Sequence, residues 1–452
     1  MKKFFFLLLL LPYFFFAQCW QKVSISATHT LAIKADGTLW AWGQNSYGQL
    51  GDGTTASKTT PVQIGTDNNW WQISSGVQNT IALKTDGTLW SWGQNNDGQL
   101  GDGTFINRFT PFQVGTDIDW SFIPKTTSGY HNAAIKANGT LWAWGYNSTG
   151  QVGDGTLVNK NVPTQEGTAT NWKTVSVGGF FTMALKTDNT LWTWGSNSLG
   201  QLGIGSTTNK SVPQQVGSAT YWLSIAAGGF NCLATKMDDT LWSWGYNNFG
   251  QLGDGTVTSR YSPTQVGTDN NWMTIASGVY HSVVIKQNGT LWAWGNNNNS
   301  QLGDGTILNT ATPNQVGTST NWHDVFANGF RSSAFTTNND LYSWGRNIEG
   351  QLGDGTLINK TTPTQIICTP LATEQFVDNS DFIVYPNPVS SILFVQSDVY
   401  LIESVRVVDM LGNQILDQKA KDQINVSSLS KGLYLLEITS QNKKYYKKFL
   451  KQ

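Results

Sequence analysis

Leu291-Trp292-Ala293-Trp294-Gly295 is one of seven near-copies of a single stretch, and this stretch decides the fold. In each copy a Trp-Gly pair closes the stretch, and successive pairs lie 50 or 52 residues apart. The tryptophans of these pairs are Trp42, Trp92, Trp144, Trp194, Trp244, Trp294 and Trp344. All 21 tryptophans fall on this position, on the position two residues earlier, or at the opening of each unit. A fixed period near 50 residues is typical of propellers and solenoids.

Each unit contains four short strand signals. In the sixth unit we expect strands at residues 273–276, 281–286, 290–295 and 312–316, the last one started by Pro313. Asn288-Gly289 separates the second strand from the third, and such pairs favour a tight hairpin because both residues accept positive φ. Proline is tolerated at the start of a strand or on an edge strand. The pattern predicts an all-β fold, with a seven-bladed β-propeller of four-stranded blades over residues 18–367.

The third strand also predicts how blades contact one another. Trp292 and Trp294 face one side of the strand, while Leu291 and Ala293 face the other. The residue between the paired aromatic residues is small in every unit: Ala41, Ser91, Ala143, Thr193, Ser243, Ala293 and Ser343. We infer that the aromatic face of one blade packs against the small-residue face of its neighbour. The tryptophan rows are therefore interpreted as structural, in preference to a carbohydrate-stacking surface.

The N-terminus predicts export. Lys2 and Lys3 precede an apolar run at residues 4–16, and a cleavage point follows Ala17, so residues 1–17 are expected to be a signal peptide. A lipoprotein anchored through Cys19 is the alternative, which Gln18 disfavours. No other apolar run reaches 18 residues, so no transmembrane segment is expected in the mature chain. The expected location is the periplasm and then the cell surface or the medium.

Composition excludes some partners and suggests a crosslink. Charged residues make up 13% and the net charge is -1, so no basic surface is available for nucleic acid. Cys19 and Cys368 bracket the repeats, and the ends of a closed ring are neighbours, so a Cys19–Cys368 disulfide is expected. Two free thiols on the chain ends are the alternative. Cys232 occupies a strand position held elsewhere by Thr or Ser and is expected to be buried.

Two recurring polar positions are interpreted as structural. A loop aspartate recurs in six units, and the fourth unit has Ile204 in its place: Asp52, Asp102, Asp154, Asp254, Asp304 and Asp354. Because each blade supplies one carboxylate, no calcium cage is expected, and turn formation beside glycine accounts for them. His29, His131 and His281 share one strand-start position and are expected to form structural hydrogen bonds. The sequence predicts no metal site, no cofactor and no catalytic residue.

The positions that differ between blades are the better candidates for binding. Just before the histidine position, five consecutive blades carry an aromatic residue: Tyr130, Phe180, Phe230, Tyr280 and Phe330. Thr28 and Gln78 occupy the same position in the first two blades. If these rings are exposed, they form an arc suited to sugars or to a protein loop. The alternative is that they fill the core between blades. The third unit has two extra residues and contains Pro124, which predicts a bulge near this face.

The repeats resemble those of the regulator-of-chromosome-condensation family. The likeness is carried by Gly289-Thr290-Leu291-Trp292-Ala293-Trp294-Gly295, by Gln301-Leu302-Gly303-Asp304-Gly305, and by Pro313 with Val316. Kelch repeats lack the Gly-Gln-Leu-Gly loop, and Asp-box repeats need a different aspartate spacing. The founders of the family exchange guanine nucleotides on a nuclear GTPase and contact chromatin. Export excludes that partner, and secreted bacterial members of the family imply a protein-binding propeller.

The tail, residues 381–452, resembles the C-terminal sorting domain of type IX secretion substrates in Bacteroidetes. Its motif residues are Tyr385, Pro386, Asn387, Pro388, Gly432 and Tyr434. The resemblance implies a small β-sandwich recognised by the outer-membrane translocon, with an accessory β-domain as the alternative. Residues 368–380 are expected to be a linker.

Two functions remain open at this stage. The first is a non-enzymatic secreted or cell-surface propeller that binds or adheres to an extracellular protein or glycan through one face. The second is a secreted polysaccharide hydrolase or lyase, which needs a pair of carboxylates with shifted pKa values in one pocket. Because the acidic residues fall mostly in repeated turns, the first function is preferred.

Overall fold

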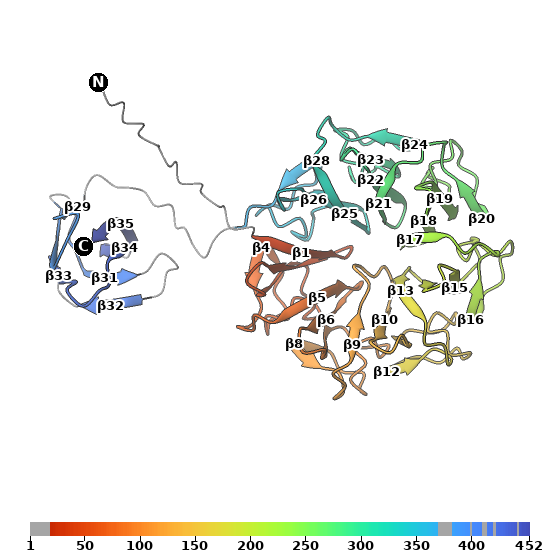
Figure 1. Cartoon of the computed structure of the whole chain (residues 1–452), viewed down its shortest axis with the longest axis horizontal. Helices are drawn as coiled ribbons and strands as arrows, with labels where there is room; N and C mark the ends of the chain where they lie inside the picture. Colours follow the sequence, from red (N-terminus) through yellow and green to blue (C-terminus); the bar gives the residue numbers. More distant parts are fainter. Residues whose placement is uncertain (1–18, 369–381, 398–399, 409–413, 419–421, 441–442) are drawn as a thin grey trace, which may run out of the picture. The chain divides into compact units, whose positions relative to one another are not determined.

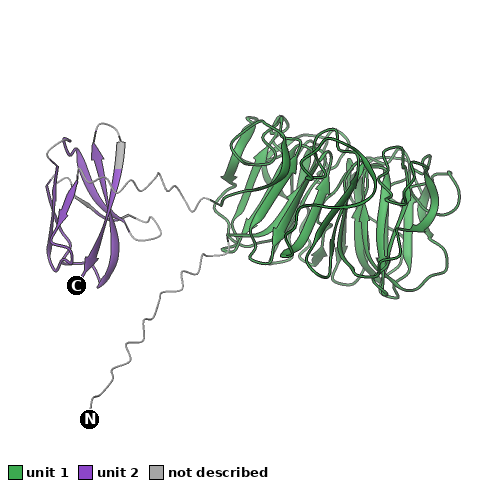
Figure 2. Cartoon of the chain, turned by 90° about the horizontal axis from the view of Figure 1, so that it is seen from above, with its two compact units in different colours: residues 1–368 green, residues 369–452 purple. Residues whose placement is uncertain are grey.

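The computed structural model describes residues 19–368, 382–397, 400–408, 414–418, 422–440 and 443–452. Every regular element in these ranges is a β-strand. The chain divides into two compact units, Met1–Cys368 and Thr369–Gln452, which Figure 2 colours separately. The predicted signal peptide and most of the predicted linker lie outside the described residues. Among the described residues, no helix has the length and apolar character needed to span a membrane.

The first unit is a ring of seven four-stranded antiparallel sheets, which confirms the predicted propeller (Figure 1). Blades 1 and 2 comprise β1 (Trp20–Ile25), β2 (His29–Lys34), β3 (Leu39–Gly43), β4 (Lys58–Gln63), and β5 (Trp70–Ser75), β6 (Asn79–Lys84), β7 (Leu89–Gly93), β8 (Arg108–Gln113). Blades 3 and 4 comprise β9 (Trp120–Phe122), β10 (His131–Lys136), β11 (Leu141–Gly145), β12 (Lys160–Gln165), and β13 (Trp172–Val177), β14 (Phe181–Lys186), β15 (Leu191–Gly195), β16 (Lys210–Gln215). Blades 5 and 6 comprise β17 (Trp222–Ala227), β18 (Asn231–Lys236), β19 (Leu241–Gly245), β20 (Arg260–Gln265), and β21 (Trp272–Ser277), β22 (His281–Lys286), β23 (Leu291–Gly295), β24 (Thr310–Gln315). Blade 7 comprises β25 (Trp322–Asn328), β26 (Arg331–Thr336), β27 (Leu341–Gly345) and β28 (Lys360–Gln365).

The fourth strand begins earlier than predicted. In blade 6 it runs from Thr310, so Pro313 lies within the strand and not at its start. The register skips between Ala293 and Gly295, and this irregularity lengthens the pairing toward the loop. Because β24 pairs with a single neighbour, an internal proline removes no ladder hydrogen bond on its open side. A proline in every outermost strand also discourages pairing between separate molecules.

The predicted packing of neighbouring blades is what the structure shows. Trp92 of blade 2 is fully buried and packs with Leu39 and Ala41 of blade 1 in one core cluster. A side chain at Gly51, whose φ is +82°, would lie 2.7 Å from the Trp92 indole nitrogen. The loop glycine is thus required by the tryptophan of the next blade. Equivalent clusters join the remaining neighbouring blades, so each seam between blades has its own apolar core.

A lysine at the end of the second strand lies against the outer tryptophans in six blades. In blade 5, the Lys236 ammonium is 3.3 Å from the Trp242 ring centroid and 5.1 Å from that of Trp222. The six lysines are Lys34, Lys84, Lys136, Lys186, Lys236 and Lys286. Their recurrence at one position in six blades makes these cation–π contacts part of the scaffold.

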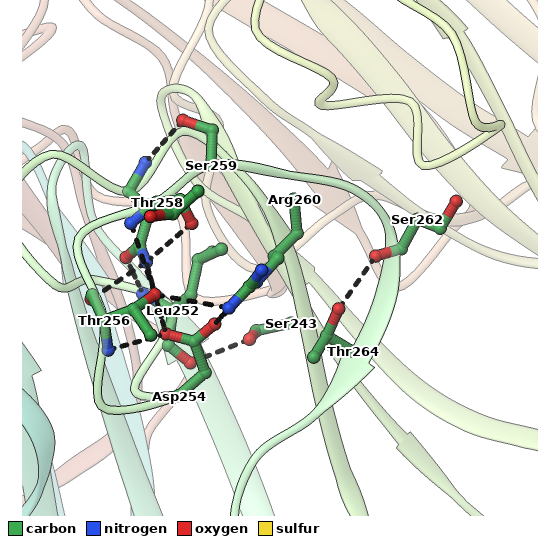
Figure 3. Close-up of polar contacts among 10 residues, drawn as sticks. Ser243, Leu252, Asp254, Thr256, Thr258, Ser259, Arg260, Ser262 and Thr264 are labelled. Carbon is green, nitrogen blue, oxygen red and sulfur yellow. Dashed lines mark hydrogen bonds and ion pairs between the residues drawn. The ribbon is translucent and has the colours of Figure 1, made fainter.

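The loop after the third strand is held by its aspartate (Figure 3). In blade 5, Asp254 accepts hydrogen bonds from the Thr256 amide at 3.0 Å and from its hydroxyl at 2.7 Å. Arg260 adds an ion pair with the other carboxylate oxygen at 2.6 Å. Burial raises the pKa of Asp254, but the bonds from Thr256 and Arg260 outweigh it and lower the pKa overall. The loop carboxylates are therefore turn-forming groups, as predicted.

Blade 7 meets blade 1 through a buried arginine and a disulfide. The Arg331 guanidinium is fully buried and donates to the Ser26 carbonyl and the Thr30 hydroxyl, both at 2.7 Å. Cys19 and Cys368, which precede and follow the repeats, are joined with their Cα atoms 5.9 Å apart. The chain ends of the ring are thus neighbours.

Blade 3 departs from the repeat in a way that reaches across the ring. Its first strand, β9, ends at Phe122, and Thr127 forms an isolated parallel bridge with Val177 of blade 4. The Thr127 amide donates to the Ser75 carbonyl of blade 2 at 3.1 Å, and its own carbonyl accepts from Asn328 of blade 7 at 2.9 Å. Since first strands of adjacent blades contact one another around the axis, residues 123–128 join the inner strands of three other blades. The predicted bulge is therefore a segment that crosses the ring.

The second unit contains two antiparallel sheets. The first has β29 (Ile383–Tyr385), β30 (Ile392–Gln396) and β33 (Gln423–Asn425). The second has β31 (Ser404–Val408), β32 (Gln414–Gln418), β34 (Gly432–Ser440) and β35 (Lys443–Lys451). Their inner faces share one apolar core that includes Phe382, Leu393, Leu436 and Phe449. This is the small C-terminal β-domain that the sequence predicts.

Candidate functional site

The variable residues gather at one end of the blades. The turn between the first two strands and the start of the long loop lie side by side, because the loop amide donates to the turn carbonyl in every blade. In blade 5 this bond joins the Tyr246 amide to the Phe230 carbonyl at 3.0 Å. The same bond recurs in blade 1 between Gln44 and Thr28 at 2.9 Å. The backbone of this end is uniform, while its side chains change from blade to blade.

Three positions per blade make up this surface, which we name the variable face. The turn positions are Thr28, Gln78, Tyr130, Phe180, Phe230, Tyr280 and Phe330. The first loop positions are Gln44, Gln94, Tyr146, Ser196, Tyr246, Asn296 and Arg346, of which Gln94 and Asn296 are buried. The second loop positions are Tyr47, Asp97, Thr149, Leu199, Phe249, Asn299 and Glu349. Side chains from the loop of one blade contact the turn of the next, as between Thr149 and the Phe180 carbonyl at 3.2 Å.

Five rings from blades 5, 6 and 7 form what we name the aromatic cluster: Phe230, Tyr246, Phe249, Tyr280 and Phe330. Tyr280 is central, with its ring centroid 5.7 Å from Phe230, 5.8 Å from Tyr246, 5.1 Å from Phe249 and 6.0 Å from Phe330. All five side chains are partly exposed. Burial, and then the neighbouring Tyr246, raise the pKa of the Tyr280 hydroxyl above its ordinary value.

A smaller group of rings lies on blades 3 and 4. The Phe180 ring is 6.5 Å from that of Tyr130 and 6.2 Å from that of Tyr146. The five aromatic residues proposed from the sequence are thus all partly exposed, and each touches at least one other ring. The rings therefore have features of both alternatives, the exposed arc and the filling of the core between blades. Each ring packs against a neighbouring ring and is also partly exposed.

Sequence reasoning missed four rings of this surface: Tyr146, Tyr246, Tyr47 and Phe249. The first two follow a Trp-Gly pair directly, a position that also varies between blades. The variation at this position is the sequence signal that could have identified Tyr146 and Tyr246. Their proximity to the turn residues depends on the hydrogen bond between loop and turn, which the sequence does not display.

The histidines bridge neighbouring blades below this surface. The His131 ring nitrogen Nε2 lies 2.8 Å from the Thr182 hydroxyl, and that of His281 lies 2.9 Å from the Ser332 hydroxyl. His29 pairs likewise with Thr80 at 3.2 Å. All three are fully buried. Burial lowers the pKa of each to about 3, and Arg331 adds to this effect at His29.

Glu166 and Cys232 are two further buried titratable groups of the propeller. Across the described ranges, no three His, Cys, Asp or Glu side chains lie close enough to hold a metal ion. Glu166 is a buried carboxylate at a position that is apolar in the other blades, and burial raises its pKa against the opposing effect of Lys186. It follows the outermost strand β12, away from the aromatic cluster. Cys232 is buried, and its thiol contacts the Gln201 carbonyl at 3.2 Å.

In the second unit, three of the predicted motif residues contact the last strand: Asn387, Gly432 and Tyr434. Asn387 donates to the Lys448 carbonyl at 3.1 Å and accepts from the Leu450 amide at 2.9 Å. The Tyr434 ring lies 5.8 Å from Phe449, and its hydroxyl donates to the Ser430 carbonyl at 3.0 Å. Tyr385 is 45% exposed. Asn387 therefore ties the start of this unit to its end.

Comparison with known proteins accounts for both units. Residues 14–267 and 126–380 match the RCC1-like domain, two overlapping stretches that together span the propeller. The chain belongs to the RCC1-like domain family. Residues 383–452 match the secretion system C-terminal sorting domain. The sorting domain confirms the resemblance to type IX substrates and indicates export to the cell surface or secretion.

Solved structures support the RCC1-like fold. Human WBSCR16 is 21% identical and aligns over 73% of this chain and 94% of its own, with a TM-score of 0.66. Prp20p from Saccharomyces cerevisiae is also 21% identical and aligns over 81% of this chain and 90% of its own, with a TM-score of 0.65. At this identity the likeness concerns the fold alone.

One curated relative is the ultraviolet-B receptor UVR8 of Arabidopsis thaliana. It is 28% identical over 157 residues, which are 34% of this chain and 36% of UVR8. The match thus spans about a third of the receptor's length. The shared stretch supports the presence of RCC1-like repeats, and the activity of the receptor is not assigned to this chain.

Proposed function

We propose that this protein is a non-catalytic binding propeller that recognises an extracellular protein or glycan through its variable face. The observation that carries the proposal is the contrast between a uniform backbone and variable, partly exposed side chains at one end of the blades. Binding residues commonly lie at exposed loop positions, where the side chain is not needed to maintain the repeat. The sorting domain supplies the route by which this surface reaches the outside of the cell.

The interior of the ring favours binding over catalysis. A catalytic pair of carboxylates needs a pocket that shifts their pKa values apart. Asp324 lies near the crossing segment and forms an ion pair with Lys125, with Nζ–O distances of 2.9 and 2.7 Å. The loop aspartates are bound in turns. A polysaccharide hydrolase or lyase remains the second candidate and is tested alongside.

The test compares the mature chain with a Tyr130→Ala/Phe180→Ala/Phe230→Ala variant on a glycan array and on an array of purified extracellular proteins. Near-ultraviolet circular dichroism verifies that the variant is folded. We expect binding on one array that the variant loses by at least tenfold. Equal binding by both proteins on both arrays would refute the proposal. Release of reducing ends or unsaturated products from the bound polysaccharides would favour the hydrolase or lyase.

A further inference from the structure

We infer that the ligand of the variable face is a neutral polysaccharide, an inference that rests on the proposed function and narrows it. Of the 21 positions of the variable face, nine are aromatic and three are charged. The aromatic residues are Tyr47, Tyr130, Tyr146, Phe180, Phe230, Tyr246, Phe249, Tyr280 and Phe330. The charged residues are Asp97, Arg346 and Glu349. A surface so rich in rings and so poor in charge fits a ligand that is uncharged and has apolar faces.

A pyranose ring meets both requirements. Its axial C–H groups form an apolar face that stacks on an aromatic ring, while its hydroxyls point outward and need hydrogen-bonding partners. Phe230 and Tyr280 stack on each other, with centroids 5.7 Å apart and planes 18° apart, and both side chains are partly exposed. Tyr246 and Tyr280 place phenolic hydroxyls in the same cluster, 5.8 Å apart between ring centroids. Tyrosine combines a flat apolar surface with a polar tip, which suits a ligand with the same two properties.

The flanking residues supply further uncharged hydrogen-bonding groups. Thr28 and Gln78 are partly exposed on blades 1 and 2, and Asn299 is partly exposed on blade 6. Amides and hydroxyls bind sugar hydroxyls without the charge that carboxylate or sulfate groups demand. An acidic polysaccharide requires several arginines or lysines, since anionic groups are bound by charge-assisted pairs. Arg346 is the one cation of the variable face, and it shares its blade with Glu349.

The placement of the rings favours a polymer. The aromatic residues recur at one turn position in five consecutive blades, so similar stacking sites follow one another around the ring. The contacts between Tyr130 and Phe180 at 6.5 Å and between Tyr280 and Phe330 at 6.0 Å bridge successive blades. A chain of identical sugar units can occupy several such sites at once. Weak sites that are linked in this way add up to useful avidity.

Affinity electrophoresis of the mature full-length chain tests the inference. Native gels contain a neutral polysaccharide (β-1,3-glucan, mannan, xylan or starch) or an acidic one (alginate or heparin). We expect at least one neutral polysaccharide to retard the protein, and a Phe230→Ala/Tyr280→Ala/Phe330→Ala variant to lose at least tenfold in affinity. Tyr280→Phe is expected to keep most of the retardation, because the stacking surface remains.

Matched controls separate stacking from general loss of aromatic surface. Trp71→Ala/Tyr221→Ala removes two aromatic side chains that are 39% and 47% exposed and lie outside the variable face. This variant is expected to migrate like the wild type. Retardation by acidic polysaccharides alone, or equal migration of the folded triple variant and the wild type, would overturn the inference. A third outcome is that no polysaccharide retards the protein, while it binds a defined protein and the triple variant does not. This outcome would refute the inference of a polysaccharide ligand and would leave the proposed function standing.

Discussion

The guanidinium of Arg331 donates a hydrogen bond to the carbonyl of Gln351 at 2.7 Å, in the place that a tryptophan occupies elsewhere in the ring. In the other six blades the loop glutamine carbonyl accepts from the Trp indole of the next blade, as Gln49 does from Trp92 at 3.0 Å. At the closing seam, the Trp42 indole nitrogen has no hydrogen-bond partner among the described residues. Arg331 has therefore taken over a bond that the repeat assigns to tryptophan.

Replacing Arg331 should loosen the closing seam. Arg331→Met removes the donor to the buried Ser26 carbonyl, and we expect the free energy of unfolding to fall by about 1 to 3 kcal/mol, measured by urea denaturation. Arg331→His introduces the residue that three other blades carry, and should be milder because Trp42 can then donate to Gln351. Arg346→Ala, a change at the surface of the same blade, is the control. A stability of Arg331→Met equal to that of the control would show that the seam does not depend on this side chain.

Thiol counting tests the link between Cys19 and Cys368. Burial raises the pKa of the Cys232 thiol well above its usual value, so the native chain should react with no thiol reagent. After unfolding without reductant, one thiol per chain should react. Three reactive thiols would exclude the disulfide.

The disulfide should also contribute stability. It closes a loop with a sequence separation of 349 residues, for which chain entropy sets an upper limit of roughly 6 kcal/mol. A Cys19→Ser/Cys368→Ser variant should unfold at a lower temperature, and reductant should lower the midpoint of the wild type alone. Equal midpoints for the two proteins under oxidising conditions would contradict this.

The buried histidines should make stability fall as the pH falls below about 6.5. Their pKa values are about 3 in the folded chain, so the unfolded chain binds protons that the folded chain does not. Stability is complete above the unfolded pKa of about 6.5 and declines toward pH 3. Between pH 7.5 and 5.5 each histidine should cost about 1.4 kcal/mol.

The matched variant is His131→Asn/His281→Asn, because Asn79 and Asn231 already occupy this position in two blades. Urea midpoints at pH 7.5 and 5.5 should differ less in this variant than in the wild type. An unchanged difference would assign the pH dependence to other groups.

The crossing segment should be stabilised mainly by its buried hydrogen bond with Asn328, and less by its exposed ion pair with Asp324. Asn328→Ala removes the bond to the Thr127 carbonyl, and we expect a loss of about 1 to 3 kcal/mol, because that carbonyl is left buried and unpaired. Lys125→Ala removes an exposed ion pair with Asp324 and should cost less than about 1 kcal/mol. Denaturant midpoints of both variants test the difference. A larger loss for Lys125→Ala than for Asn328→Ala would contradict this account.

The repeat made most of the fold predictable. The period, the Trp-Gly pairs and the hairpin signals sufficed for seven blades of four strands, because each unit repeats the same local chemistry. The lysines over the tryptophans were not foreseen, since a lysine at a strand end reads as a solvated charge. Lys236 contacts Trp242 only because its strand ends beside the next strand's aromatic residue.

The candidate site was predictable in part. The turn aromatic residues could be singled out because they vary where the backbone does not, but Tyr246 and Phe249 come from a loop whose path depends on bonds across the blade. Arg331 occupies the histidine position of its blade, and its role could not be predicted because Ser26, His29 and Thr30, which it bonds, lie about 300 residues earlier in the chain. The contact between Asn328 and Thr127 also joins distant segments, so no local pattern announces it.

The contact that the crossing segment at residues 123–128 makes with blade 7 also depends on the number of blades in the ring. A gene made of near-identical units can gain or lose one by recombination, and most seams of this ring would accept the change, since each uses the same bonds. The crossing segment has a fixed length, however. Its Thr127 in blade 3 reaches Asn328 in blade 7 only when three blades separate them on one side of the ring. A ring with one unit more or fewer would change the distance between Asn328 and Thr127, so their hydrogen bond fits a ring of seven blades.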